Sequence, residues 1–129
     1  MTETDSEQAR RARGATVYRE VYGDGATALE RGQSDFFDLM MDHLFAEVWA
    51  RPGLSIPSRR LLVMGVLAAQ RLFDTLGTQF ARALETGELT VEHVREVVIQ
   101  LVPYVGYPSS SGLYRVSETA IAQHRRGDA

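Results

Sequence analysis

The side chains that could do chemistry in this chain are arginine, the carboxylates, histidine and the hydroxyl residues, because it has neither cysteine nor lysine. Without cysteine there can be no disulfide, no Cys-x-x-Cys redox pair and no thiolate nucleophile. Without lysine there can be no Schiff base with a carbonyl substrate or with pyridoxal phosphate. The three histidines, His43, His93 and His124, lack metal-ligand spacing. We therefore expect no cofactor and no metal.

Two pairs of residues have a spacing that suits a binding site. Glu47 lies one helical turn before Arg51 and could orient its guanidinium, although this spacing is more often that of a solvated ion pair. Glu96 and Tyr104 are close enough in angle to share a helix face unless Pro103 disturbs the helix. The ordinary alternatives for the second pair are an exposed carboxylate and a packed aromatic ring.

Helical periodicity and helix caps dominate the rest of the chain. Apolar residues recur at helical spacing from Ser34, and this pattern places Leu44 on the buried face of a helix. Turn residues interrupt the pattern, with Gly87 where a helix C-terminal cap belongs and Thr90 as the expected N-cap of the next helix. The expected helices cover 34–49, 55–69, 74–86 and 90–105, with a last one running towards His124. The first residues are either an arm or a helix reaching Tyr22 that Gly14 breaks. We expect an all-α, single-domain bundle of about six helices over 14–129, preceded by a flexible or partly helical arm, 1–13.

The segment 61–69 is apolar on every side, so a helix here leaves no face for water. In a chain of 129 residues this indicates burial by a partner subunit as well as by the chain's own fold. A buried parallel strand is the rival interpretation, but no alternating strand and helix units accompany it. The pattern therefore favours a homo-oligomer.

Charge and hydropathy limit the other partners. The net charge is only −3 and there is no basic stripe, so nucleic acid is a poor partner. No apolar run approaches the roughly 20 residues that cross a bilayer, and the first residues are polar rather than signal-like. We expect a cytoplasmic protein that does not bind membranes.

Several separated blocks make the chain resemble the 4-carboxymuconolactone decarboxylase family, within the alkylhydroperoxidase D-like superfamily. They cover most of the chain from about Gly14 to Ala122. The matching blocks are Arg19-Glu20-Val21-Tyr22-Gly23-Asp24, Phe36-Phe37-Asp38-Leu39, Glu47 to Leu54, Arg59, Ala83-Leu84, Gly87, Thr90, Glu92, Arg95-Glu96, Gln100 and Tyr104 to Pro108.

The resemblance implies a helical fold that assembles into trimers or hexamers and loses CO₂ from a small anionic lactone without a cofactor. Such a site must hold the carboxylate, stabilise an oxyanion and return a proton to carbon. Arginine suits the first two tasks, which favours Arg51 and Arg59, with Arg59 preferred to Arg60 by its motif position. The implied catalytic residues are Arg51, Arg59, Gln79 and Glu96. The implied substrate-binding residues are Glu47, Trp49, Tyr104, Gly106 and Pro108.

The departures from the family pattern bear directly on activity. Family members place histidine four residues before the alanine that is Ala83 here, and this chain has Gln79. Glutamine forms hydrogen bonds but does not exchange a proton near neutral pH. The family's Ala-Ala-Asn-His is replaced by Ser109–Gly112. Leu72 and Thr75 stand where the peroxidase branch needs a cysteine pair, which excludes a thiol peroxidase.

Three functions follow as hypotheses. The first is a cofactor-independent carboxy-lyase acting on a small carboxylated lactone in aromatic-acid catabolism. The second is a non-catalytic or repurposed oligomeric binding protein, which the missing histidines favour. The third is a tailoring enzyme or isomerase built on the same scaffold.

Overall fold

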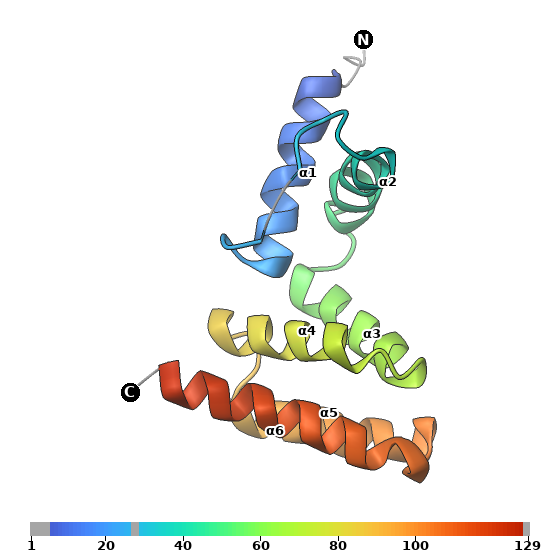
Figure 1. Cartoon of the computed structure of the whole chain (residues 1–129), viewed down its shortest axis with the longest axis vertical. Coiled ribbons are helices and arrows are strands. Elements are labelled where there is room, and N and C mark those ends of the chain that lie inside the picture. Colours follow the sequence, from blue (N-terminus) through green and yellow to red (C-terminus); the bar gives the residue numbers. More distant parts are fainter. Residues whose placement is uncertain (1–5, 27–28, 128–129) are drawn as a thin grey trace. The chain divides into compact units, whose positions relative to one another are not determined.

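A computed structural model describes residues 6–26 and 29–127, whose regular elements are helices, with no strand among them (Figure 1). The all-α prediction is therefore confirmed for this part of the chain. By internal contacts the chain forms two compact units, Met1–Ile56 and Pro57–Ala129, and each is described by itself. The assignment of 14–129 to one domain, and of 1–13 to an arm, stays a prediction.

The first unit packs helix α1, Glu7–Tyr22, against helices α2, Asp35–Leu39, and η1, Met40–Trp49 (Figure 1). The Ser6 hydroxyl caps α1 by accepting from the Ala9 N–H, at 3.0 Å. The helix continues through Gly14, so the expected break there is absent.

The expected helix over 34–49 exists, but its second part is a π-helix. Ser34 is its cap, because the Ser34 hydroxyl accepts from the Phe37 N–H at 3.2 Å. A π-turn holds more residues than an α-turn, so the buried face shifts along the sequence. Phe45 and Trp49 are buried, whereas Leu44, which the α-helical pattern placed inside, is exposed.

Gly14 lets α1 approach η1 closely. A Cβ atom built at this position would overlap the carbonyl oxygen of Met41, which is backbone and cannot rotate away. We expect Gly14→Ala to lower the free energy of unfolding by about 1–3 kcal/mol, although helix propensity alone favours alanine. Urea denaturation measures this, with Gly53→Ala as control because nothing lies near a Cβ at Gly53. Equal midpoints for the two variants would contradict this account of the α1–η1 contact.

The second unit contains four helices and a short 3₁₀ turn. They are α3, Ile56–Ala69; α4, Phe73–Thr86; α5, Val91–Val105; η2, Tyr107–Ser109; and α6, Ser110–Gly127. Gly87 ends α4 in the left-handed region at φ 80°, as its position predicted. Thr90 caps α5 in a capping box with His93. Pro103 does not end α5, which continues for two residues to Val105.

The core of this unit is formed by the inner faces of all four helices. Helix α4 packs along α6, as Figure 1 shows. The side chains with no exposed surface include Met64 of α3, Leu76 and Phe80 of α4, Val94 of α5 and Leu113 of α6. Because α4 lies on this core, a polar residue on its inner face must find partners inside the protein.

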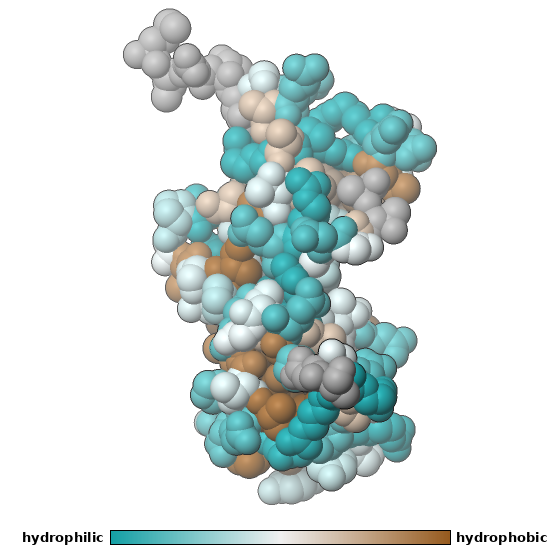
Figure 2. Space-filling view, turned by 90° about the vertical axis from the view of Figure 1, so that its left-hand side faces the viewer, coloured by the Kyte–Doolittle hydropathy of each residue, from teal (hydrophilic) through white to brown (hydrophobic). Residues whose placement is uncertain are grey.

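Some apolar side chains remain at the surface. Space-filling colours show apolar residues among hydrophilic ones on one face (Figure 2). On α3 the exposed ones are Leu61, Leu62 and Val66. No helix in the described ranges is both long and apolar enough to cross a membrane.

Candidate functional site

A buried polar cluster in the second unit joins α3, α4 and the segment after α4. The Arg60 guanidinium donates from Nε to Glu88 Oε2 at 2.6 Å and from Nη2 to Glu88 Oε1 at 3.1 Å. Its Nη1 donates to the Gln79 side-chain oxygen at 2.7 Å. Arg60 and Gln79 are each only 1% exposed. Arginine is rarely buried to this degree unless it is paired, and here a bidentate carboxylate pairs it.

Local structure explains how the three side chains meet. Gln79 lies three residues after Leu76 and four before Ala83 on α4, and both of these are fully buried, so its side chain shares the interior face of the helix. Arg60 lies one turn before Met64, which is fully buried on α3. Glu88 follows the left-handed Gly87 that ends α4, so the chain turns back towards α3. The cluster therefore depends on a helix end as well as on two helix faces.

The amide nitrogen of Gln79 stands apart from the rest of the cluster. Among the described residues, it is the buried side-chain nitrogen or oxygen atom that lacks a hydrogen-bond partner. A buried polar group without a partner costs about 1–3 kcal/mol, so this donor is suited to a guest with an acceptor atom.

The residues predicted from the sequence in this unit lie in different places. Gln79 joins the cluster, while Arg59 is half-buried on α3. Glu96 and Tyr104 are exposed on α5, and Tyr104 is 82% exposed. Gly106 caps α5 at φ 101°, and Pro108 lies in the following 3₁₀ turn. Sequence reasoning preferred Arg59 to Arg60 and missed Glu88 entirely.

The remaining predicted residues belong to the first unit. Trp49 is buried and stacks on Phe45 with ring centroids 6.3 Å apart. The Glu47 carboxylate contacts Arg10 Nη1 at 2.7 Å and His43 Nδ1 at 3.1 Å. Arg51 lies just after η1 and is exposed. The proposed convergence of these residues with Gln79 stays a prediction.

The segment that replaces the family's Asn-His has structural contacts of its own. The Ser109 hydroxyl is buried and accepts from Arg71 Nε at 2.8 Å. A Cβ atom at Gly112 would overlap the ring of Phe73. A histidine at Gly112 would therefore need Phe73 to move, which leaves Gln79 as the better place to restore one.

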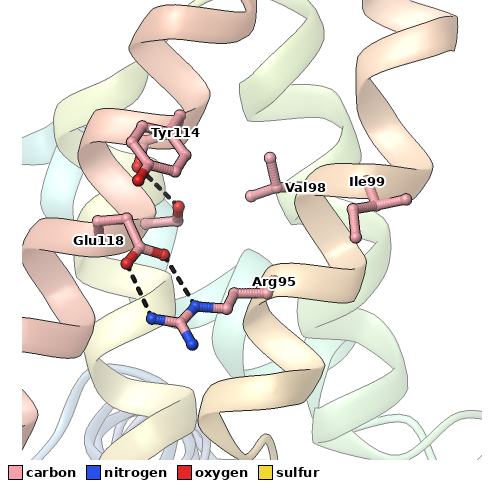
Figure 3. A pocket seen from close by; sticks show the side chains of 6 residues that line it. Arg95, Val98, Ile99, Tyr114 and Glu118 are labelled. Atoms are coloured by element: carbon pink, nitrogen blue, oxygen red, sulfur yellow. Dashed lines mark hydrogen bonds and ion pairs between the residues drawn. The ribbon is translucent and has the colours of Figure 1, made fainter.

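A hollow lies between α5 and α6 in the same unit. It encloses about 300 Å³ and is lined by Arg95, Val98, Ile99, Tyr114, Ser117 and Glu118. Figure 3 shows side chains of α5 and α6 on its two sides, with the Arg95–Glu118 ion pair across it. Because this arginine is already bound by a carboxylate and the walls are largely apolar, the hollow has no arrangement for stabilising an oxyanion.

The Arg95–Glu118 pair predicts an acid dependence of stability. The hydrogen bonds from Arg95 lower the pKa of the Glu118 carboxyl below its ordinary value. The stabilisation is therefore present above the unfolded pKa of about 4.3 and is lost as pH falls through the lower folded pKa. We expect Glu118→Gln to remove this part of the acid dependence, measured as unfolding midpoints at neutral and acidic pH. If the unfolding midpoint falls by the same amount from neutral to acidic pH in Glu118→Gln and in wild type, this prediction is contradicted.

One family pattern and two known decarboxylases are similar to this sequence. The pattern of the carboxymuconolactone decarboxylase family matches residues 34–118. A nitrosuccinic acid decarboxylase from Metarhizium robertsii is 33% identical over 72 residues, which are 56% of this chain and 50% of that protein. The 4-carboxymuconolactone decarboxylase of Acinetobacter baylyi is 26% identical over 118 residues, 88% of this chain and 87% of that protein. This chain thus aligns with only half of the fungal relative but with most of the bacterial one.

Proposed function

The chain belongs to the carboxymuconolactone decarboxylase family, and on that premise we propose that it is a cofactor-independent carboxy-lyase acting on a small carboxylated lactone or a related acid. Two relatives named as decarboxylases support CO₂ loss as the class of reaction. The buried, unpartnered amide nitrogen of Gln79 is the observation that carries the site assignment.

Decarboxylation needs a group in the substrate that can accept an electron pair. When the C–C bond to the carboxylate breaks, CO₂ leaves and its bonding electrons stay on carbon. In 4-carboxymuconolactone the unsaturated lactone takes up these electrons as a dienolate; in nitrosuccinic acid the nitro group takes them up as a nitronate. Negative charge develops on oxygen in each case. A fixed donor aimed at that oxygen lowers the barrier.

Gln79 is suited to be this donor. Its carbonyl oxygen already accepts from Arg60, while its amide nitrogen has no partner. The site is almost fully buried, and an N–H donor is stronger where water is excluded. Glutamine does not supply the proton that must return to carbon, so that proton comes from water or from another acid.

Purified protein incubated with 4-carboxymuconolactone or with nitrosuccinate tests the proposal through CO₂ release. We expect turnover above the uncatalysed rate with at least one of them. Succinate is the matched control substrate, because it is a dicarboxylate without an electron-accepting group and should release no CO₂. Tight binding of both acids without turnover would overturn the lyase proposal in favour of a binding protein.

The binding-protein alternative rests on one specific observation. The position where the resemblance implies histidine holds Gln79, and its neighbour Arg60 is already paired with Glu88. A site that has a hydrogen-bond donor but lacks a proton donor can bind a ligand without converting it. The same CO₂ assay, combined with calorimetric binding, separates the two functions.

Helix α3 supports a homo-oligomer, which we propose as the working state of the protein. Leu61, Leu62 and Val66 are between 45% and 63% exposed on one helix, and a second copy of the chain would remove this apolar surface from water. We expect Leu62→Glu to lower the mass measured by light scattering to that of a smaller assembly or a monomer. An unchanged mass would exclude this face from the interface.

A further inference from the structure

The Arg60–Gln79 contact fixes which way the Gln79 amide points. A guanidinium carries only donors, so the amide atom 2.7 Å from Arg60 Nη1 must be the oxygen. The amide is planar, and its nitrogen therefore points away from Arg60 with two N–H groups. In this position the Gln79 oxygen is held by Arg60, and the N–H groups are the part of the side chain that is open to a guest.

Glu88 in turn fixes Arg60. Its two oxygens take Nε and Nη2, which sets the plane of the guanidinium and leaves Nη1 for Gln79. The Glu88 side chain is 12% exposed and the Arg60 side chain 1%, so Glu88 lies on the solvent side of the cluster. Because the charges of Glu88 and Arg60 cancel, the guest meets oriented N–H groups without a net charge behind them.

We propose that Glu88 is a positioning residue that acts through Arg60 to hold the Gln79 amide with its nitrogen towards the substrate. This inference rests on the proposed function and names the class of substrate group that the site accepts. That class is an acceptor oxygen that gains negative charge during the reaction, such as an enolate or nitronate oxygen.

Nuclear magnetic resonance of ¹⁵N-labelled full-length protein tests the orientation without any turnover. The Gln79 side-chain amide signals are assigned by their loss in Gln79→Met. In Glu88→Gln, which keeps the shape but removes the charge, we expect these signals to shift and to exchange faster with water. Glu85→Gln is the matched control, since Glu85 lies near the same helix end but pairs with Arg82 at the surface. If Glu88→Gln does not fold, Glu88→Asp replaces it and should give a smaller shift.

Steady-state kinetics with 4-carboxymuconolactone or nitrosuccinate, whichever the protein turns over, give a second test of the role of Glu88. We expect Glu88→Gln to lower kcat/KM about tenfold in the wild-type background and to have no further effect in Gln79→Met. A purely structural role would lower activity in both backgrounds and would overturn the proposal, as would unchanged Gln79 signals. Shifted signals in a protein that turns over neither acid would support the positioning role and would defeat the lyase function.

Discussion

Gln79→His should raise the turnover of 4-carboxymuconolactone about 100-fold, because general acid catalysis by a placed imidazole contributes at least that much. The wild-type amide stabilises charge but does not deliver a proton to carbon. Imidazole does both near neutral pH. The variant should also acquire a pH dependence of kcat/KM between about pH 5 and 8 that wild type lacks at this position. Steady-state rates across that range measure both effects.

The matched control for this gain is Gln123→His, which places the same residue on the exposed face of α6. It should leave the rate and the pH profile unchanged. If Gln79→His has the rate and pH profile of wild type, the loss of histidine does not limit activity, and proton return must use a group outside this cluster.

Arg60→Met should lower the free energy of unfolding by about 3–5 kcal/mol, because breaking a buried ion pair leaves its partner uncompensated. Glu88 would lose its bidentate donor, and the Gln79 oxygen would lose its 2.7 Å donor. Methionine keeps most of the length and apolar volume, so the loss reports the polar contacts. Denaturant unfolding followed by circular dichroism measures it.

Arg95→Met is the matched control, since Arg95 also forms a bidentate pair, with Glu118, but at the surface. Its effect should be clearly smaller. The double variant Arg60→Met with Glu88→Gln should recover part of the loss, because it removes the uncompensated charge. An Arg60→Met variant as stable as Arg95→Met would show that the cluster is not a stabilising element.

The helices could be predicted because their signals are local. Thr90 and Gly87 mark the ends of neighbouring helices, and both act as expected. The π-helix has no local sequence signal, and for this reason Leu44 was placed inside. In the helical alternative for the first residues, Gly14 was expected to break the helix because glycine is a poor helix former. Its close approach to Met41 could not be predicted, because Met41 lies in a distant part of the sequence.

The site was only partly predictable for a similar reason. Arg59 and Arg60 are about 100° apart on one helix, and only the helix phase decides which is buried. Residues 61–69, which follow Arg60, are apolar on every side of the helix, so the sequence does not show which face of this helix is buried. Glu88 meets Arg60 across 28 residues from outside a helix, which no periodic pattern reveals. Glu47 contacts Arg10, which lies 37 residues earlier in the sequence, and helical spacing does not indicate a contact of this kind.

The central claim is that the buried amide nitrogen of Gln79 stabilises the oxygen that becomes negative as CO₂ leaves. Gln79→Met removes the donor and keeps the side-chain length, and CO₂ release from the acid that wild type converts is the direct measurement. We predict a fall in kcat of about 100-fold, with Gln123→Met unchanged. A Gln79→Met variant that releases CO₂ at the wild-type rate would contradict the claim.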